Sequence, residues 1–460
     1  MENNTTEKKG WDSIETAQRN YAYPCGADGI SEPSDGRYLG NLLLSQNMAL
    51  CMDTRLTRIN NNVLLIGSAG TGKTRHYIKP NLLQANSSYL VVDPSGEISE
   101  SVRDYLEEKG YAVKVFKPDD LASSVHYNPL AYVETDSDMA VIADVIISAA
   151  HNHNPAAPSA DIFFIQAEKQ ILISVISYVV KREPKENRNM SRVAELIRDM
   201  YVDERSPRPI SKTDVMFQAY EKECPDDPAM TAYKTVRTLL TGRTLKAVII
   251  SLMVAVKPFT EDQVNLITED DTIDLESVGK KKQAIFIAIP TMTTTYDFLV
   301  PMMIYQAVNL MYKNQPSPEI PGMASFRSGL CMHLILDEFG RIGRIPNFPI
   351  MLATMRKHGM SCSIIVQSKS QIKAIYEDDT DTIIANCSTL LYFGSPNATD
   401  AEYVSGRLQK YGPHVKSMYP DALLRASNDT CYIIMERAGV FTDRKYRLED
   451  HCNYNKLRDM

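Results

Sequence analysis

Residues 67–74 carry the strongest chemical signal in the chain. They form a G-x4-G-K-T motif made of Gly67, Ser68, Ala69, Gly70, Thr71, Gly72, Lys73 and Thr74. The glycines allow successive backbone N–H groups to curl around phosphate oxygens, and the N-terminus of a following helix adds partial positive charge. In such a loop Lys73 reaches the β- and γ-phosphates, and the Thr74 hydroxyl binds Mg²⁺. The motif therefore predicts a site for ATP, or a related nucleotide, with Mg²⁺.

Two adjacent acids end the apolar run at 331–336 (CMHLIL). A Mg²⁺-bound nucleotide needs a carboxylate at the end of a neighbouring strand, and Asp337 meets that need. Glu338 would then polarise the attacking water, which makes hydrolysis the expectation rather than binding alone. The alternative is a pair of strand-end acids that face solvent.

Gln367 and Arg356 are two further candidates. Gln367 follows the apolar run at 363–366, so it is expected at the carboxyl edge of the sheet, where it would orient water and report the γ-phosphate. Its alternative is a surface role as the cap of the helix at 368. Arg356 ends the helix after the acid pair and could stabilise transition-state charge across a subunit interface, as an arginine finger does. A basic side chain at a helix C-terminus is also favourable without such a function.

Short apolar runs alternate with helical stretches around these residues. The runs lie at 62–66, 89–92, 112–116, 284–289, 332–336, 363–366 and 390–393, followed by a hairpin-like pair at 430–435 and 440–446. Helical stretches at 72–84 and 97–108 separate the first three runs. Buried strands that alternate with helices indicate an α/β fold with a mainly parallel sheet covered on both faces.

The pattern changes between residues 137 and 260, where the sequence has no clear strand-like run. Helical stretches lie instead at 138–150, 160–182, 190–200, 211–223 and 229–255, joined by loops that contain proline. We therefore expect an all-α insertion at 137–260 in an α/β domain built from 46–136 and 261–460. Residues 1–45 are expected to form a polar, loosely packed leader.

The bulk composition limits the class of protein further. The chain has 460 residues, a net charge of −7 and a pI of about 5.7, which excludes a globally basic nucleic-acid binder but not a locally basic channel. The eight Cys form no CxxC pair and indicate core thiols in a reducing cytosol. The sequence shows no signal peptide, and the apolar segment 162–180 is interrupted by polar residues and is interpreted as a buried helix. The chain as given is expected to be soluble.

Several further segments follow one another in a recognisable order and spacing. They are 63–74 (VLLIGSAGTGKT), 91–97 (VVDPSGE), 127–130 (YNPL), 334–343 (LILDEFGRIG), 345–348 (IPNF), 364–371 (IIVQSKSQ) and 384–387 (IANC). With these segments the chain resembles the VirD4/TraG type IV coupling proteins, the conjugative DNA-transfer ATPases, in the form found in Gram-positive mobile elements. The resemblance covers about residues 45–445 and is far more specific than a P-loop alone.

The resemblance implies a RecA-like P-loop ATPase domain that is interrupted by an all-α domain. The expected residue types stand at the family positions of Lys73, Thr74, Asp337, Glu338, Gln367 and Arg356. The resemblance also implies a homo-hexameric motor at the cytoplasmic face of a type IV secretion channel. There the motor would receive relaxase-bound single-stranded DNA and couple ATP hydrolysis to DNA export in conjugation. In this family the all-α domain recognises DNA or the relaxosome.

The sequence departs from the family pattern at two places. Ser95 stands where a Lys is usual, which removes a positive charge near the nucleotide. Typical members begin with one or two transmembrane helices, whereas here about 60 polar residues precede the P-loop strand. The chain is therefore expected to be either a member without its own transmembrane helix, held peripherally at the inner face of the membrane by a partner, or a shortened form.

Two other functions compete with the motor. A nucleotide-dependent adaptor would bind relaxase or effector cargo without translocating DNA; the missing anchor favours it and the complete set of site residues disfavours it. A HerA/FtsK-like duplex pump would share the motor core, but the YNPL and IPNF segments argue against it. Basic residues such as those at 181–192 are more often a solvated surface than a DNA contact, so the DNA expectation rests on the resemblance.

Overall fold

The computed structural model describes residues 14–22, 40–152, 162–201, 210–289, 296–315, 331–411 and 419–458. The chain divides into two compact units, each described by itself below. Unit 1 comprises residues 1–114, 277–289 and 307–460, and unit 2 comprises 115–276 and 290–306. Most of the expected N-terminal leader, 1–45, lies outside the described residues.

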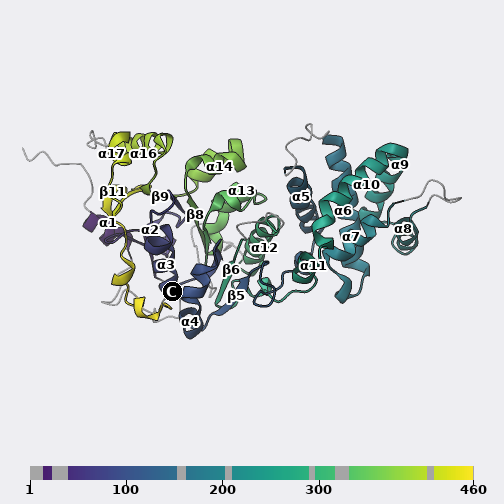
Figure 1. The fold of residues 1–460 in the computed structure, drawn as a ribbon, viewed down its shortest axis with the longest axis horizontal. Coiled ribbons are helices and arrows are strands. Elements are labelled where there is room, and N and C mark those ends of the chain that lie inside the picture. Colours follow the sequence, from purple (N-terminus) through teal and green to yellow (C-terminus); the bar gives the residue numbers. More distant parts are fainter. Residues whose placement is uncertain are drawn as a thin grey trace, which may run out of the picture. The chain divides into compact units, whose positions relative to one another are not determined.

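A nine-stranded sheet forms the centre of unit 1 (Figure 1). Its strands, in spatial order, are β11 (Gly439–Arg444), β10 (Thr430–Met435), β9 (Thr389–Gly394), β3 (Val63–Gly67), β8 (Met360–Val366), β7 (Met332–Leu336), β4 (Ser88–Val92), β6 (Gln283–Ile287) and β5 (Ala112–Phe116). The pairs from β9 through β3, β8, β7 and β4 to β6 are parallel, whereas β10 pairs antiparallel with β9 and β11. A separate antiparallel pair is formed by β1 (Asn41–Leu43) and β2 (Ala49–Cys51).

The central strands are buried along their whole length, which explains why their sequences are mostly apolar. Every residue of β3, β7 and β8 is buried. Parallel strands covered on both faces have no polar alternation, because neither face meets water. The register pairs Ile66 with Val366 and Leu336 with Ile364, so the carboxyl ends of these three strands lie along one edge of the sheet.

The helices that belong wholly to unit 1 cover the sheet. They are α1 (Ile14–Tyr21), α2 (Thr54–Thr57), α3 (Lys79–Leu83), α4 (Glu97–Glu108), α13 (Phe348–Thr354), α14 (Lys369–Tyr376), α15 (Thr380–Ala385), α16 (Ala398–Tyr411) and α17 (Pro420–Leu424). The crossovers through α3 and α4 run in one direction along the sheet, and those through α13 and α14 run in the other. Because such crossovers are right-handed, the two helix pairs lie on opposite faces, as Figure 1 shows.

Helix α12 (Leu299–Asn314) is divided between the two units. Shorter helical turns are the π-helix η1 (Thr74–Ile78) and the 3₁₀ helices η2 (Pro129–Tyr132), η3 (Lys185–Asn187), η4 (Lys257–Thr260), η5 (Leu275–Ser277), η6 (Phe339–Arg341), η7 (Met355–His358), η8 (Glu377–Asp379), η9 (Leu448–Asp450) and η10 (Tyr454–Lys456). The helix expected at 72–84 therefore begins at Thr74 as a π-helical turn and continues as α3, with Pro80 in its first turn.

Unit 2 contains the helices of the sequence stretch without strands, together with α11 just beyond its end. They are α5 (Asp136–Asn152), α6 (Ile162–Arg182), α7 (Met190–Arg198), α8 (Lys212–Glu223), α9 (Pro228–Leu239), α10 (Gly242–Val256) and α11 (Asp262–Thr268). One prediction was wrong here, because the single helix expected at 229–255 is two helices. The break falls at Leu240 and Thr241, which are extended, and at Gly242, whose φ of 58° lies in the left-handed region that glycine tolerates best.

Helix α6 is the core helix of unit 2. Its apolar side includes Ile171, Leu172 and Val175, which are fully buried. By length and composition it is the one described helix that could cross a membrane, and half of the relevant window is buried inside the structure. A core helix of a water-soluble domain passes the same test, so this is weak evidence for a membrane span.

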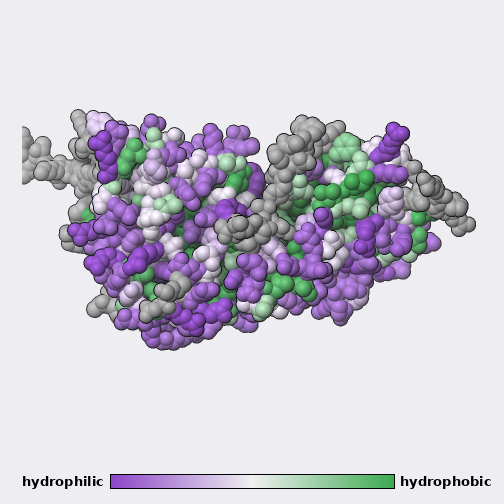
Figure 2. Space-filling view, viewed as in Figure 1, coloured by the Kyte–Doolittle hydropathy of each residue, from purple (hydrophilic) through white to green (hydrophobic). Residues whose placement is uncertain are grey.

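The surface of unit 2 also exposes apolar side chains. Figure 2 shows them as a green area over α6 and α10. Ile250 is 56% exposed and Val254 is 63% exposed on α10, one helical turn apart. Unit 2 therefore presents an apolar surface on α10 in addition to its buried core.

Candidate functional site

The loop between β3 and η1 has the backbone of a phosphate cradle. Gly70 and Gly72 both have left-handed φ values, 78° and 77°. At Gly72 a side chain would also collide with a neighbour, because an added Cβ would lie 2.4 Å from the ring of His76. A residue with a side chain at position 72 would thus need a left-handed torsion angle and a displaced His76 ring.

Lys73 is folded back onto its own loop. Its Nζ donates to the carbonyl oxygens of Gly67, at 2.9 Å, and Ser68, at 3.1 Å. Burial lowers the pKa of Lys73, and the charges of Asp337 and Glu338 oppose that shift. The ammonium group is therefore held beside the cradle and within electrostatic reach of both acids.

The acid pair follows β7 directly. Asp337 is 7% exposed, and its Oδ1 accepts a hydrogen bond from the Glu338 backbone N–H at 2.9 Å. Burial raises the pKa of Asp337 to about 6, while that hydrogen bond and Lys73 act in the opposite direction. Glu338 forms an ion pair with Arg341 at 3.5 Å. Asp337 is thus a desolvated carboxyl group that a nearby cation would stabilise in its charged form.

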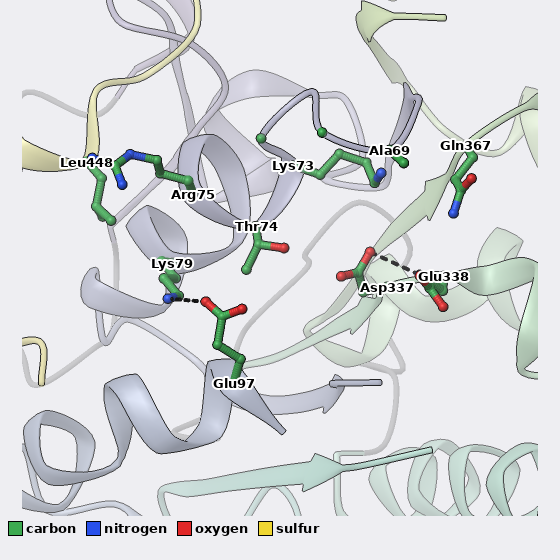
Figure 3. Close-up of a pocket in the computed structure, with 12 residues that line it drawn as sticks. Ala69, Lys73, Thr74, Arg75, Lys79, Glu97, Asp337, Glu338, Gln367 and Leu448 are labelled. Carbon is green, nitrogen blue, oxygen red and sulfur yellow. Dashed lines mark hydrogen bonds and ion pairs between the residues drawn. The ribbon is translucent and has the colours of Figure 1, made fainter. Parts of the chain in front are cut away.

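One cavity of about 410 Å³ joins the loop and the acids. It is lined by Ala69, Gly70, Gly72, Lys73, Thr74, Arg75, Lys79, Glu97, Asp337, Glu338, Gln367 and Leu448. Figure 3 shows the Thr74 hydroxyl directed toward the carboxylate of Asp337. The structure therefore brings the two sequence motifs to one cavity, although more than 260 residues separate them in the chain.

Gln367 lies where the sequence placed it, directly after β8 and on the wall of the same cavity. In Figure 3 its amide points toward the two acids. Its backbone N–H donates to the Gln371 side chain at 2.8 Å. The cap of helix α14 is Ser368, whose side chain accepts from the Ser370 backbone N–H, so the alternative role of Gln367 as that cap is not the one observed.

Three motif residues and Arg356 do not line this cavity. Gly67 ends β3, whereas Ser68 and Thr71 line a second cavity of about 190 Å³. Arg356 lies in η7, just before β8 begins, and therefore near the amino edge of the sheet. Its guanidinium group donates to the Thr54 carbonyl oxygen at 2.9 Å. Within its own chain Arg356 is held away from the candidate nucleotide site.

Four cavity residues were missed by the sequence reasoning. They are Arg75, Lys79, Glu97 and Leu448. Lys79 forms an ion pair with Glu97 at 2.8 Å, and Arg75 pairs with Glu449. The position of Glu97 in the 91–97 motif was a usable signal, because that motif follows a strand of the same sheet. Leu448 carried no such signal, since it is brought there by the C-terminal segment.

The acidic groups at the carboxyl edge fit a hard cation. Asp93 directly follows β4, the strand beside β7, and is fully buried. Its Oδ2 accepts from the Ser99 backbone N–H at 2.8 Å, whereas its Oδ1 has no hydrogen-bond partner among the described residues. Mg²⁺ prefers carboxylate, hydroxyl and water oxygens, and Asp337 with Thr74 presents such donors in the same cavity.

Several basic residues singled out in the sequence are paired within unit 2. Lys181 bonds to Asp227 at 2.7 Å, and Arg192 bonds to Glu183 at 2.9 Å. Arg182 pairs with Glu223. Their charges are therefore partly neutralised within unit 2.

A glycine-rich loop after a central parallel strand, an acid pair after another strand of the same sheet and a crevice at their carboxyl ends define a RecA-like P-loop nucleotide-binding protein. Residues 30–429 match the family described as "Type IV secretory system Conjugative DNA transfer". This match spans well over half of the chain, so the chain belongs to that family. The predictions of the fold class and of the family from the sequence are confirmed.

Two curated relatives are both named "Conjugal transfer protein TraG". The protein of Rhizobium radiobacter is 22% identical over 357 residues, which cover 76% of this chain and 52% of the relative. The protein of Agrobacterium fabrum is 21% identical over 369 residues, with coverage of 78% and 52%. The chain therefore spans about half the length of the curated relatives it matches.

Solved structures share the fold. The bacterial conjugative coupling protein TrwBdeltaN70 superposes with a TM-score of 0.65 at 13% identity, covering 94% of this chain and 91% of that chain. TrwB in complex with ADP and Mg²⁺ gives a TM-score of 0.61 at 13% identity, covering 84% and 85%. VirB4 of Thermoanaerobacter pseudethanolicus gives 0.53 at 13% identity, covering 91% and 98%. At these identities the likeness establishes the arrangement of the elements.

Proposed function

We propose that this chain is an ATP-hydrolysing coupling protein that drives relaxase-bound single-stranded DNA into a type IV secretion channel during conjugation. Membership of the conjugative DNA-transfer family supports the setting. The observation that carries the enzymatic part is the single cavity lined by both the P-loop and the acid pair. TrwB, which shares the fold, has been solved with ADP and Mg²⁺ and with a non-hydrolysable ATP analogue.

The P-loop residues hold the phosphates of ATP. The backbone N–H groups of 67–74 surround the phosphate oxygens, and Lys73 leaves its loop carbonyls to reach the β- and γ-phosphates. Exchanging a carbonyl partner for a phosphate lets the ammonium group meet a full negative charge, which strengthens the hydrogen bond. Lys73 thus moves a short distance within the cavity it already lines.

Thr74 and Asp337 would hold Mg²⁺, which when bound neutralises charge on the phosphates. Glu338 orients and polarises the attacking water, and Gln367 contacts that water or the γ-phosphate. Arg356 acts from a neighbouring subunit of a homo-hexamer, since it is remote from the cavity of its own chain. A completed site therefore needs the assembly, and an isolated monomer hydrolyses ATP slowly.

The all-α insertion at 137–260 recognises DNA or the relaxosome in this proposal. The motor works in the cytoplasm at the inner face of the cell membrane, beside channel components of the secretion system. Membership of the conjugative DNA-transfer family supports this location. In the described part of the chain, α6 alone has the length and composition of a candidate membrane span.

ATP turnover by the purified chain, with and without single-stranded DNA, tests the motor. We expect single strands to stimulate turnover and to promote oligomers in sedimentation experiments. Lys73→Ala removes the phosphate-binding cation and is expected to abolish turnover, whereas Lys410→Ala, at an exposed position of α16, retains it. Wild-type activity in Lys73→Ala would refute the site.

A nucleotide-dependent adaptor is the competing function. It would bind relaxase or effector cargo in the presence of ATP without translocating DNA. Tight, nucleotide-dependent cargo binding combined with no stimulated turnover would favour the adaptor. Strand displacement or directional movement along a single strand, measured with the same preparation, would favour the motor.

A further inference from the structure

A second lysine, Lys445, is buried behind the phosphate-binding loop. It follows β11 directly and is 2% exposed. Lysine is almost never this buried without partners, because its ammonium group loses hydration. Its Nζ donates to the Thr71 carbonyl oxygen at 2.9 Å and to Asn428 Oδ1 at 3.2 Å. It also lies 4.9 Å from the centre of the Phe393 ring, a distance at which a cation and an aromatic face attract.

The contact with Thr71 bears on the orientation of the cradle. A trans peptide is planar, and its C=O and N–H groups point in opposite directions. Since Lys445 holds the Thr71 carbonyl oxygen, the N–H group of Gly72 in the same peptide points away from Lys445. Gly72 lines the nucleotide cavity, whereas Thr71 lines the second cavity. The hydrogen bond from Lys445 therefore acts on the peptide between Thr71 and Gly72, two residues that line different cavities.

Both partners of this hydrogen bond, Lys445 and Thr71, are held by further hydrogen bonds. Its backbone N–H donates to the Asp429 carbonyl oxygen at 2.8 Å, within the hairpin of β10 and β11. Thr71 is held from inside the loop as well, because its side-chain oxygen donates to the Ser68 carbonyl oxygen at 2.8 Å. The peptide at 71–72 is therefore hydrogen-bonded both within its own loop and to Lys445, which follows the hairpin 374 residues further along the chain.

We propose that Lys445 is a positioning residue for the phosphate-binding loop. It holds the Thr71 carbonyl oxygen, so that the Gly72 N–H group points away from Lys445 before a nucleotide binds. It also adds positive charge next to the loop. This inference rests on the proposed nucleotide site. It adds a residue outside the P-loop motif to the groups that determine affinity for a polyphosphate.

The charges around Lys445 make its contribution depend on pH. Burial lowers the pKa of Lys445 to about 8, Cys431 and Asp429 oppose that shift, and Lys73 adds to it. Thr71 and Asn428, its direct hydrogen-bond acceptors, are uncharged. A bound polyphosphate favours the charged form of a nearby lysine, so affinity is highest below about pH 8 and falls as Lys445 loses its proton above that pH.

The experiment compares Mg-ADP affinity, measured by calorimetry between about pH 6.5 and pH 9.5, in three variants. Lys445→Met keeps the length of the side chain without charge or donor, Lys445→Arg keeps both, and Lys410→Met is an exposed control. We expect Lys445→Met to weaken binding about tenfold at neutral pH, the size of one hydrogen bond to a charged group. Lys445→Arg should restore most of the affinity, and the pH dependence near 8 should be absent in Lys445→Met.

A second, more conservative variant keeps the inference testable if Lys445→Met does not fold. Asn428→Ala retains the lysine but removes one acceptor, which should lower the pH at which affinity declines. Wild-type affinity in Lys445→Met, or equal losses in the Met and Arg variants, would overturn the inference, as would an unchanged pH profile in Asn428→Ala. If the wild-type chain binds no nucleotide, the result would instead contradict the proposed function.

Discussion

Asp337 and Glu338 are neighbours in the chain, and both side chains line the same cavity. In a continuing strand they would point to opposite faces of the sheet. Strand β7 ends at Leu336, and Glu338 adopts a left-handed conformation, with φ 46° and ψ 47°. This backbone is unfavourable for a residue with a side chain, and such torsions concentrate at functional sites. The turn at Glu338 places two acids of different environment side by side.

Glu338→Gln should separate binding from hydrolysis. The amide retains the size of the side chain but removes the carboxylate that polarises water, so we expect a loss of at least about 100-fold in ATP turnover. Nucleotide affinity should change little, because the phosphate contacts come from the loop. Single-turnover hydrolysis and calorimetry on the same sample measure both. Glu107→Gln, at an exposed position of α4, is the matched control. Undiminished turnover in Glu338→Gln would remove Glu338 from the catalytic set.

Gly72→Ala and Gly70→Ala should differ, although the two glycines have nearly equal φ values. Both substitutions place alanine in the left-handed region, which costs about 1 kcal/mol or more. An added Cβ at Gly70 meets nothing within 4 Å, whereas at Gly72 it meets the His76 ring at 2.4 Å. His76 is in turn hydrogen-bonded to the Tyr446 carbonyl oxygen.

We therefore expect Gly72→Ala to lower the free energy of unfolding by about 1–2 kcal/mol more than Gly70→Ala does. Denaturant unfolding without nucleotide measures the difference, so that effects on phosphate binding are left out. Equal losses in the two variants would mean that His76 moves aside at no cost.

Arg356→Ala distinguishes a catalytic role across subunits from a structural role. If Arg356 acts in a neighbouring site, turnover of the assembly should fall about 1000-fold while ADP affinity of the single chain stays unchanged. Mixing the variant with wild-type subunits should then reduce activity more than dilution does. If its hydrogen bonds to Thr54 and Arg58 are all that matter, the melting temperature falls and turnover of the folded protein persists. Lys357→Ala, an exposed neighbour, serves as the control.

His333 should make the folded protein sensitive to acid. It is buried in β7, and its ring nitrogens bond to the hydroxyls of Ser361 and Ser363. Burial lowers its pKa to about 3, so the folded state stays unprotonated at pH values where the unfolded chain, with a pKa of about 6.5, takes up a proton. The free energy of unfolding should therefore fall as the pH falls from about 6.5 toward 3.

His333→Gln retains polar atoms for the two serines but cannot titrate. Between about pH 7.5 and pH 5 we expect the wild type to lose about 1–2 kcal/mol more stability than this variant, as measured by urea unfolding. The variant keeps some acid sensitivity, because burial also lowers the pKa of His451 to about 4. Parallel curves for the two proteins would contradict the prediction.

The sequence alone determined the elements and motifs whose signals are local. Mostly apolar runs marked β3, β7 and β8, because neither face of these strands meets water. The glycines of 67–74 marked a loop whose torsions few other residues tolerate. Since carboxyl ends of parallel strands share one edge, the convergence of this loop with Asp337 could be predicted before the structure.

Only the tertiary structure decided which residues from the C-terminal segment reach the site. Lys445 bonds to Thr71 of the loop, 374 residues away in the chain, and Leu448 lines the cavity. Both follow a hairpin that adds antiparallel strands to the sheet. The periodicity of apolar residues in the sequence does not predict such contacts. They depend on the order of the strands in the sheet and on the path of the chain after the last strand. Two further features have the same origin: the left-handed turn at Glu338, and the distance between Arg356 and the nucleotide cavity of its chain. Both follow from how separate segments pack, which local residue types do not encode.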